Sequence, residues 1–133
     1  MKDTERLARE FGEHIAGLRF PDAFGMLADD GLYTVIGTTP ASGLYHGPRD
    51  LLERLVPLLA DFVEPPVVTF EDPIVQGDRA VLLGSGRGVG PTGPYDQPHY
   101  AFVMKVSDGR IVEIVEFMDT MMLQSAVFGE RAA

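Results

Sequence analysis

Two carboxylates interrupt an apolar stretch near the end of the chain, and their residue type could support proton transfer. The stretch IVEIVEFMD covers residues 111–119, and two apolar residues separate Glu113 from Glu116 within it. The stretch is typical of a strand that is buried on both faces, in which successive side chains point to opposite sides. The two glutamates therefore lie on opposite faces, and one of them must point toward the core. Alternation alone leaves open which one it is.

A carboxylate inside an apolar pocket is suited to general acid–base catalysis. Burial disfavours its charged form and raises its pKa toward neutrality. A group whose pKa lies near the working pH transfers protons effectively. The structural alternative is a buried ion pair, or a carboxylate that reaches a water-filled rim.

Arg87 is the candidate partner for this carboxylate, and it lies in the glycine-rich segment GSGRGVG at residues 84–90. The glycines occupy every second position, so one face of a strand would lack side chains while Arg87 lies on the other. Such a strand can bend sharply or let another backbone approach closely. We expect Arg87 to point to the concave side, where it would lower the pKa of the inward glutamate. A phosphate-binding loop is disfavoured, because the spacing is wrong and no helical pattern follows.

Length and composition restrict the class of protein. A chain of 133 residues predicts one domain over residues 1–133. The net charge of −9 argues against nucleic acid or an anionic membrane as partner. The absence of cysteine excludes disulfides, Cys-ligated zinc and thiol nucleophiles. No signal peptide or apolar stretch of about 20 residues is present, so we expect a cytoplasmic location.

The three histidines give no sign of a metal site. His14, His46 and His99 are scattered along the chain, and no acidic residue lies at ligand spacing from them. His99 is out of phase with the apolar residues that follow it, so we expect it on an outer face. We therefore expect neither a metal nor another cofactor.

Helical patterns come first in the sequence and strand patterns follow. The chain predicts a strand at 32–37, a loop at 38–47, and a third helix that Pro57 should kink or shorten. The expected helices cover residues 3–18, a short segment from Pro21, and 48–62. Four further strands are expected at 67–76, 79–90, 99–106 and 110–119, with a loop at 90–98. This order predicts an α+β fold with helices on one face of an antiparallel sheet.

Three stretches resemble the nuclear transport factor 2-like superfamily. MLADDGLYTVIG (26–37) resembles the end of the second helix and the first strand of ketosteroid isomerases and limonene epoxide hydrolases. SGLYHGPRDLLERL (42–55) resembles the start of the third helix, and FVMKVSDGRIVEIVEFMDT (102–120) resembles the closing hairpin of SnoaL-like proteins. The resemblance implies a cone, in which a strongly curved antiparallel sheet and three N-terminal helices enclose an apolar pocket. The superfamily contains isomerases, cyclases, hydrolases and proteins without catalytic activity.

The resemblance to ketosteroid isomerases implies a pocket but not their reaction. Their carboxylate base, oxyanion-binding Tyr and oxyanion-binding Asp match Val35, Phe11 and Phe102 here. All three positions are apolar, so steroid isomerisation by those residues is rejected. The same positions are expected to contact a substrate, together with Tyr100, which shares a strand face with Phe102.

Limonene epoxide hydrolases resemble the chain more closely at two positions. Their pocket Tyr matches Tyr33, and their inward carboxylate on the last strand matches Glu116. This match implies that Glu116 faces the pocket with Ile114 and Met118. Their Arg-x-Asp motif falls on Ser85 and Arg87, so the charge arrangement is not preserved.

Three functional hypotheses follow. The first is a cofactor-independent enzyme of isomerase, cyclase or hydrolase type that acts on a small hydrophobic, oxygenated molecule. Glu116 would transfer a proton or activate water, and Arg87 and Tyr33 would stabilise negative charge on oxygen. The second is a pocket that binds such a molecule without chemistry. The third is a homodimer formed through the outer sheet face, where the glycine face would join Val115 and Phe117.

Overall fold

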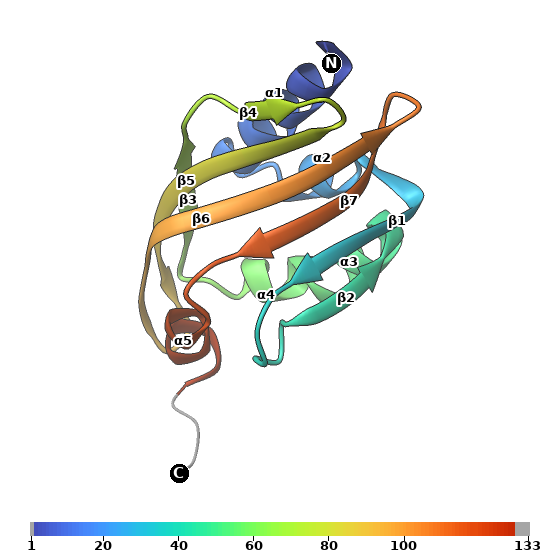
Figure 1. Cartoon of the computed structure of the whole chain (residues 1–133). Coiled ribbons are helices and arrows are strands. Elements are labelled where there is room, and N and C mark those ends of the chain that lie inside the picture. Colours follow the sequence, from blue (N-terminus) through green and yellow to red (C-terminus); the bar gives the residue numbers. More distant parts are fainter. Residues whose placement is uncertain (1, 130–133) are drawn as a thin grey trace.

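The protein folds into one strongly curved sheet with helices on its concave side (Figure 1). The structure, a computed structural model, describes residues 2–129. Its helical segments are α1 (Lys2–Ala16), α2 (Phe20–Phe24), α3 (Gly47–Arg54), α4 (Val56–Ala60), α5 (Thr120–Leu123) and the π-helical turn η1 (Gln124–Phe128). Its strands are β1 (Leu27–Val35), β2 (Gly43–His46), β3 (Glu64–Phe70), β4 (Ile74–Gln76), β5 (Arg79–Gly90), β6 (Gly93–Ser107) and β7 (Arg110–Phe117). The α+β class and the curved sheet with covering helices confirm the prediction.

The sheet is mixed rather than wholly antiparallel. Its strand order is β2-β1-β7-β6-β5-β3, with β4 paired to β5. Every pair is antiparallel except β1 and β7, which run parallel. A hairpin forces antiparallel pairing, but β1 and β7 are far apart in sequence and no short turn joins them. This parallel contact places β7 in the middle of the sheet, where both of its edges are hydrogen-bonded.

The helices cover the concave face with apolar side chains. Leu7, Phe11 and Ile15 form the buried stripe of α1, which ends at Ala16, two residues before the chain turns at Leu18 with a φ of 62°. The expected third helix is divided into α3 and α4, because Pro57 cannot continue the hydrogen-bond ladder. Within residues 2–129, no helix is long and apolar enough to span a membrane.

Two regions expected to be loops contain strand. β2 lies inside the expected loop at 38–47, and β6 begins at Gly93 inside the expected loop at 90–98. Proline and glycine suggested a loop there, but a β-bulge accommodates Pro98. The partner of Gly84 is Tyr100 whereas the partner of Gly86 is Gln97, so β6 holds one extra residue at this point. Bulges are positions at which a sheet tolerates proline.

The glycine-rich strand β5 matches its predicted bounds, but its glycines face inward. A Cβ on Gly86 would lie 3.0 Å from both Tyr100 and Val68, and one on Gly88 would lie 2.5 Å from the Glu64 carbonyl oxygen. The glycines therefore allow a close approach of neighbouring strands. The prediction that Arg87 points to the concave side is wrong, because the inside of a tight bend has the least room for side chains. The glycine face is also covered, so it cannot contribute to a dimer surface.

Candidate active site

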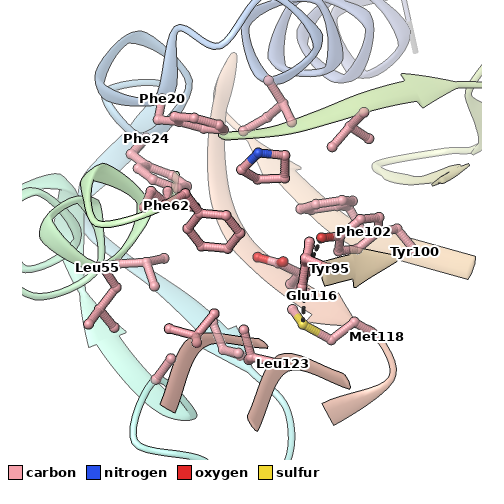
Figure 2. Close-up of a pocket in the computed structure, with 18 of the residues that line it drawn as sticks. Phe20, Phe24, Leu55, Phe62, Tyr95, Tyr100, Phe102, Glu116, Met118 and Leu123 are labelled. Atoms are coloured by element: carbon pink, nitrogen blue, oxygen red, sulfur yellow. Dashed lines mark hydrogen bonds between the residues drawn. The ribbon is translucent and has the colours of Figure 1, made fainter. Parts of the chain in front are cut away.

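An apolar cavity lies between the concave face of the sheet and the helices (Figure 2). Within this cavity, the volume that the centre of a water molecule can reach is about 70 Å³. Side chains from α1, α2, α4 and the C-terminal turns close the cavity over β1, β3, β6 and β7. Its lining is aliphatic and aromatic apart from the polar atoms of one carboxylate and three tyrosines, namely Glu116, Tyr33, Tyr95 and Tyr100.

Glu116 reaches this cavity from the middle of the sheet. On β7 it pairs with Val35 of β1 on one side and Phe102 of β6 on the other, and both of these residues also line the cavity. The Tyr33 hydroxyl donates a hydrogen bond to Oε1 of Glu116. Among the described residues no other hydrogen bond to this carboxylate is formed, and no buried side-chain oxygen or nitrogen lacks a partner. Oε2 is therefore open to the cavity.

The surroundings of Glu116 raise its pKa. Burial disfavours the charged carboxylate and raises the pKa to about 7, although the hydrogen bond from Tyr33 acts in the opposite direction. The accessible surface area of Glu116 classes it as only partly buried. Glu116 lines the cavity, so its exposed surface faces the enclosed space and the carboxylate is still surrounded by protein. Near neutral pH the carboxyl group therefore exists in both protonation states, as a proton-transfer group requires.

Tyr33 holds the carboxylate in place. Its side chain is fully buried, with the rings of Phe24 at 5.5 Å and Tyr45 at 6.5 Å in edge-to-face arrangements. Burial and then the negative charge of Glu116 raise the pKa of Tyr33 well above its usual value. The phenol therefore remains a hydrogen-bond donor at neutral pH. The Tyr33 hydroxyl donates to Glu116, whereas the sequence analysis expected it to stabilise negative charge on a substrate oxygen.

Replacing Tyr33 with phenylalanine is expected to raise the pKa of Glu116 above about 7. The substitution removes the one hydrogen bond that favours the carboxylate, while the burial that opposes it remains. Carbon-detected NMR titration of the glutamate side chains would measure the shift. Tyr45→Phe is the matched control, since the Tyr45 hydroxyl donates to the Ala41 carbonyl at 2.5 Å instead. An unchanged Glu116 titration in the Tyr33 variant would contradict this assignment.

Arg87 does not belong to the cavity. Its side chain is 84% exposed on the outer face, and its Nε lies 3.4 Å from Oδ1 of Asp96. Within the described part of the chain, Glu116 forms no ion pair. No neighbouring cation therefore lowers the pKa of this carboxylate, and burial remains the largest influence and raises the pKa.

Four of the six residues expected to contact substrate line the cavity, namely Val35, Tyr100, Phe102 and Met118. Phe11 and Ile114 do not line it, contrary to expectation. Both are fully buried in the core, and the Phe11 ring lies 5.8 Å from that of Phe102. They support the cavity wall from behind.

Several lining residues carry no clear signal in the sequence. Tyr95 lies on the part of β6 that was expected to be a loop, and the C-terminal turns contribute Leu123 and Val127. The alternation of Tyr95 with polar Gln97 was only a weak strand signal, because the burial of Gln97 is visible in the structure and not in the sequence. The prolines on either side of them suggested a loop more strongly.

A model of the SnoaL-like domain matches residues 8–114 of this chain. The chain belongs to the SnoaL-like domain family. The match confirms the family suggested by the closing hairpin of the sequence. Comparison with curated proteins gave no match.

Solved structures with the same fold cover nearly the whole SnoaL-like chain. A nuclear transport factor 2-like protein of unknown function from Burkholderia pseudomallei is 21% identical, with a TM-score of 0.81 over 96% of this chain and 98% of that one. A protein from Jannaschia provisionally named a SnoaL-like polyketide cyclase is 15% identical, with a TM-score of 0.75 over 98% and 94%. A Bacillus subtilis protein provisionally named an isomerase is 16% identical, with a TM-score of 0.75 over 97% and 95%. At these identities the likeness establishes the fold.

The stability of the SnoaL-like protein should depend on pH through Glu116. The folded-state pKa of about 7 lies above the ordinary value of 4.5, so the folded protein binds the proton more tightly than the unfolded chain. The resulting stability is fully present below about pH 4.5 and is lost as the pH rises through about 7. Relative to Glu116→Gln, the wild-type free energy of unfolding should fall by about 2–3 kcal/mol between about pH 5 and 8.

Urea denaturation of both proteins at the two pH values would measure this difference. Comparison with Glu116→Gln removes the contributions of the other titratable groups, because both proteins share them. Parallel pH dependence of the two proteins would show that the pKa of Glu116 is not raised.

Proposed function

We propose that this SnoaL-like protein is a cofactor-independent acid–base enzyme that acts on a small hydrophobic, oxygenated molecule through Glu116. The observation that carries the proposal is a carboxylate in an otherwise apolar cavity, with one oxygen held by Tyr33 and the other open. Its pKa of about 7 allows it to accept and return a proton at neutral pH. Isomerisation, cyclisation and hydration or hydrolysis are the reaction types that such a group can serve.

Each part of the site has a role in this proposal. Oε2 of ionised Glu116 would take a proton from the substrate or from a water molecule, and the protonated form would later return it. The Tyr33 hydroxyl fixes the orientation of the carboxyl group throughout. The apolar wall binds the hydrocarbon part of the substrate and excludes water, which strengthens electrostatic interactions at the reacting atoms.

The provisional names of the Jannaschia and Bacillus proteins support this reaction class. Polyketide cyclisation and isomerisation both move protons, and both names belong to proteins with the fold of this chain. Because these two proteins share little sequence identity with this chain, the substrate class has to be inferred from the properties of the cavity in this chain. No triad of His, Asp or Glu side chains suited to holding a metal ion occurs in the part of the chain that the structure describes.

A pocket that binds without chemistry is the second candidate. One observation favours it, namely that Arg87 lies on the outer face and leaves the cavity without a cationic side chain for developing negative charge. A ligand that binds Glu116→Gln as well as wild type, with no turnover by either protein, would establish this second function.

The test begins with a thermal-shift screen against apolar alcohols, ketones, epoxides and lactones. A ligand present at about 100 times its Kd adds roughly 2.7 kcal/mol to the free energy of unfolding, which such a screen detects. Each ligand that binds is then incubated with wild-type protein and Glu116→Gln, and product formation is measured. Loss of turnover with retained binding supports the enzyme.

A homodimer through the outer sheet face remains a separate proposal. The outer face carries exposed apolar side chains, with Phe117 42%, Leu44 50% and Val67 58% exposed. Light scattering of the purified chain tests it, and a monomer would contradict it.

A further inference from the structure

A pair of tyrosines forms a second polar feature inside the cavity. The hydroxyl groups of Tyr95 and Tyr100 are hydrogen-bonded to each other, and both side chains line the cavity (Figure 2). The two side chains are only 4% and 5% exposed. Residues an odd number of positions apart normally face opposite sides of a strand. The bulge at Pro98 and His99 shifts this phase and brings both phenols to the concave face.

The pair has one phenolic proton more than its internal hydrogen bond uses. Each hydroxyl has one proton to donate, and the bond between them uses one of the two. If Tyr100 donates to Tyr95, the remaining proton has the Met118 sulfur at 4.0 Å as its acceptor, which is a weak one. If Tyr95 donates to Tyr100, then no acceptor for the Tyr100 proton exists among the described residues. In both arrangements a donor without a strong acceptor lies in the cavity.

This donor persists over the whole physiological pH range. Burial, the largest cause, raises the pKa of both phenols above the usual value of 10, and the charge of Glu116 raises them further. The pair therefore remains protonated when Glu116 is ionised. The cavity then contains a proton acceptor at Glu116 and a separate hydrogen-bond donor at the tyrosines.

We propose that Tyr95 and Tyr100 form a substrate-binding subsite that donates a hydrogen bond to a carbonyl oxygen of an apolar ligand. A carbonyl fits because it is uncharged and accepts a hydrogen bond without supplying a proton of its own, and a buried donor gains most from such a partner. An anionic group would be repelled by ionised Glu116. Carbonyl compounds are then the substrate class of the proposed enzyme, and this assignment rests on the proposed function. Binding of a carbonyl compound to the two tyrosines can be measured without any turnover.

The test uses acetophenone and ethylbenzene, two probes of similar shape that differ at the carbonyl. Binding is measured by ligand-observed NMR at about pH 9, where Glu116 is ionised and cannot donate to the probe while the phenols stay protonated. The preference for acetophenone over ethylbenzene, expressed as the ratio of their dissociation constants, should be about 3- to 10-fold weaker in Tyr95→Phe/Tyr100→Phe than in wild type. The comparison cancels the different solubilities of the probes in water.

Infrared spectroscopy gives a readout that a merely structural role would not alter. The carbonyl stretch of acetophenone should move to lower frequency in the wild-type complex than in an aprotic solvent, and the double variant should lose this shift. Tyr95→Phe and Tyr100→Phe each retain one phenolic proton, so the two single variants should differ in the size of the shift. The variant with the smaller shift identifies the donor, and both variants remain available if the double variant is unstable.

Each contrary outcome overturns the inference. Failure of both probes to bind, an unshifted carbonyl in the wild-type complex, or a shift that survives in the double variant would all contradict it. The enzyme proposal fails differently, through unchanged turnover by Glu116→Gln. A carbonyl shift that depends on the tyrosines, together with such unchanged turnover, would leave a carbonyl-binding pocket without Glu116 catalysis.

Discussion

Glu116→Gln is expected to lower turnover by about 100- to 10,000-fold, the range that a general acid–base group contributes. Glutamine keeps the shape of the side chain, and its amide oxygen can still accept the hydrogen bond from Tyr33. It cannot take up a proton at neutral pH, so the variant loses the chemistry and retains the geometry. Steady-state kinetics with a substrate found by the ligand screen would measure the loss.

Glu113→Gln is the matched control for this experiment. Glu113 lies on the same strand but on the opposite face, where it pairs with Lys105 of β6 and Leu32 of β1. The same chemical change at this position should leave turnover within about twofold, since the half-buried Glu113 side chain lies on the face away from the cavity. Equal losses in both variants would trace the effect to charge or stability, and full activity in Glu116→Gln would refute the proposed role.

Phe102→Ala is expected to lower the free energy of unfolding by about 3–5 kcal/mol. Its ring is 3% exposed and lies 5.8, 5.5 and 5.6 Å from those of Phe11, Phe70 and Tyr100. Truncation removes the side chain that joins α1 to the concave face of the sheet, and it leaves space that the rigid strands cannot fill by moving. Urea or thermal denaturation at a fixed pH would measure the change.

Phe117→Ala provides the comparison for the core substitution. Phe117 is also a strand phenylalanine and pairs with Ala101, the neighbour of Phe102, but its side chain is 42% exposed on the outer face. Less apolar surface returns to water when it is truncated, so the loss should be roughly 1 kcal/mol or less. Similar losses for the two variants would show that the aromatic cluster around Phe102 is not the centre of the core.

Local patterns in the sequence determined the types of the main elements and the relative directions of their side chains. The apolar stripe of α1 and the break at Pro57 depend on neighbouring residues alone, and so does the opposition of Glu113 and Glu116. The glycines of β5 also indicated close packing correctly, because only a residue without a side chain permits it. The resemblance to known families then added which glutamate faces inward.

Only the tertiary structure decided which side of the sheet is concave and which residues meet there. Alternation gives only relative faces, so Arg87 was predicted on the concave side although its strand was predicted correctly, and the structure places its side chain on the outer face. The bulge near Pro98 depends on the register between β5 and β6, and it brings Tyr95 and Tyr100 together. The Tyr33–Glu116 hydrogen bond joins residues 83 positions apart. Such contacts form between strands that are distant in sequence, so no local pattern could specify them.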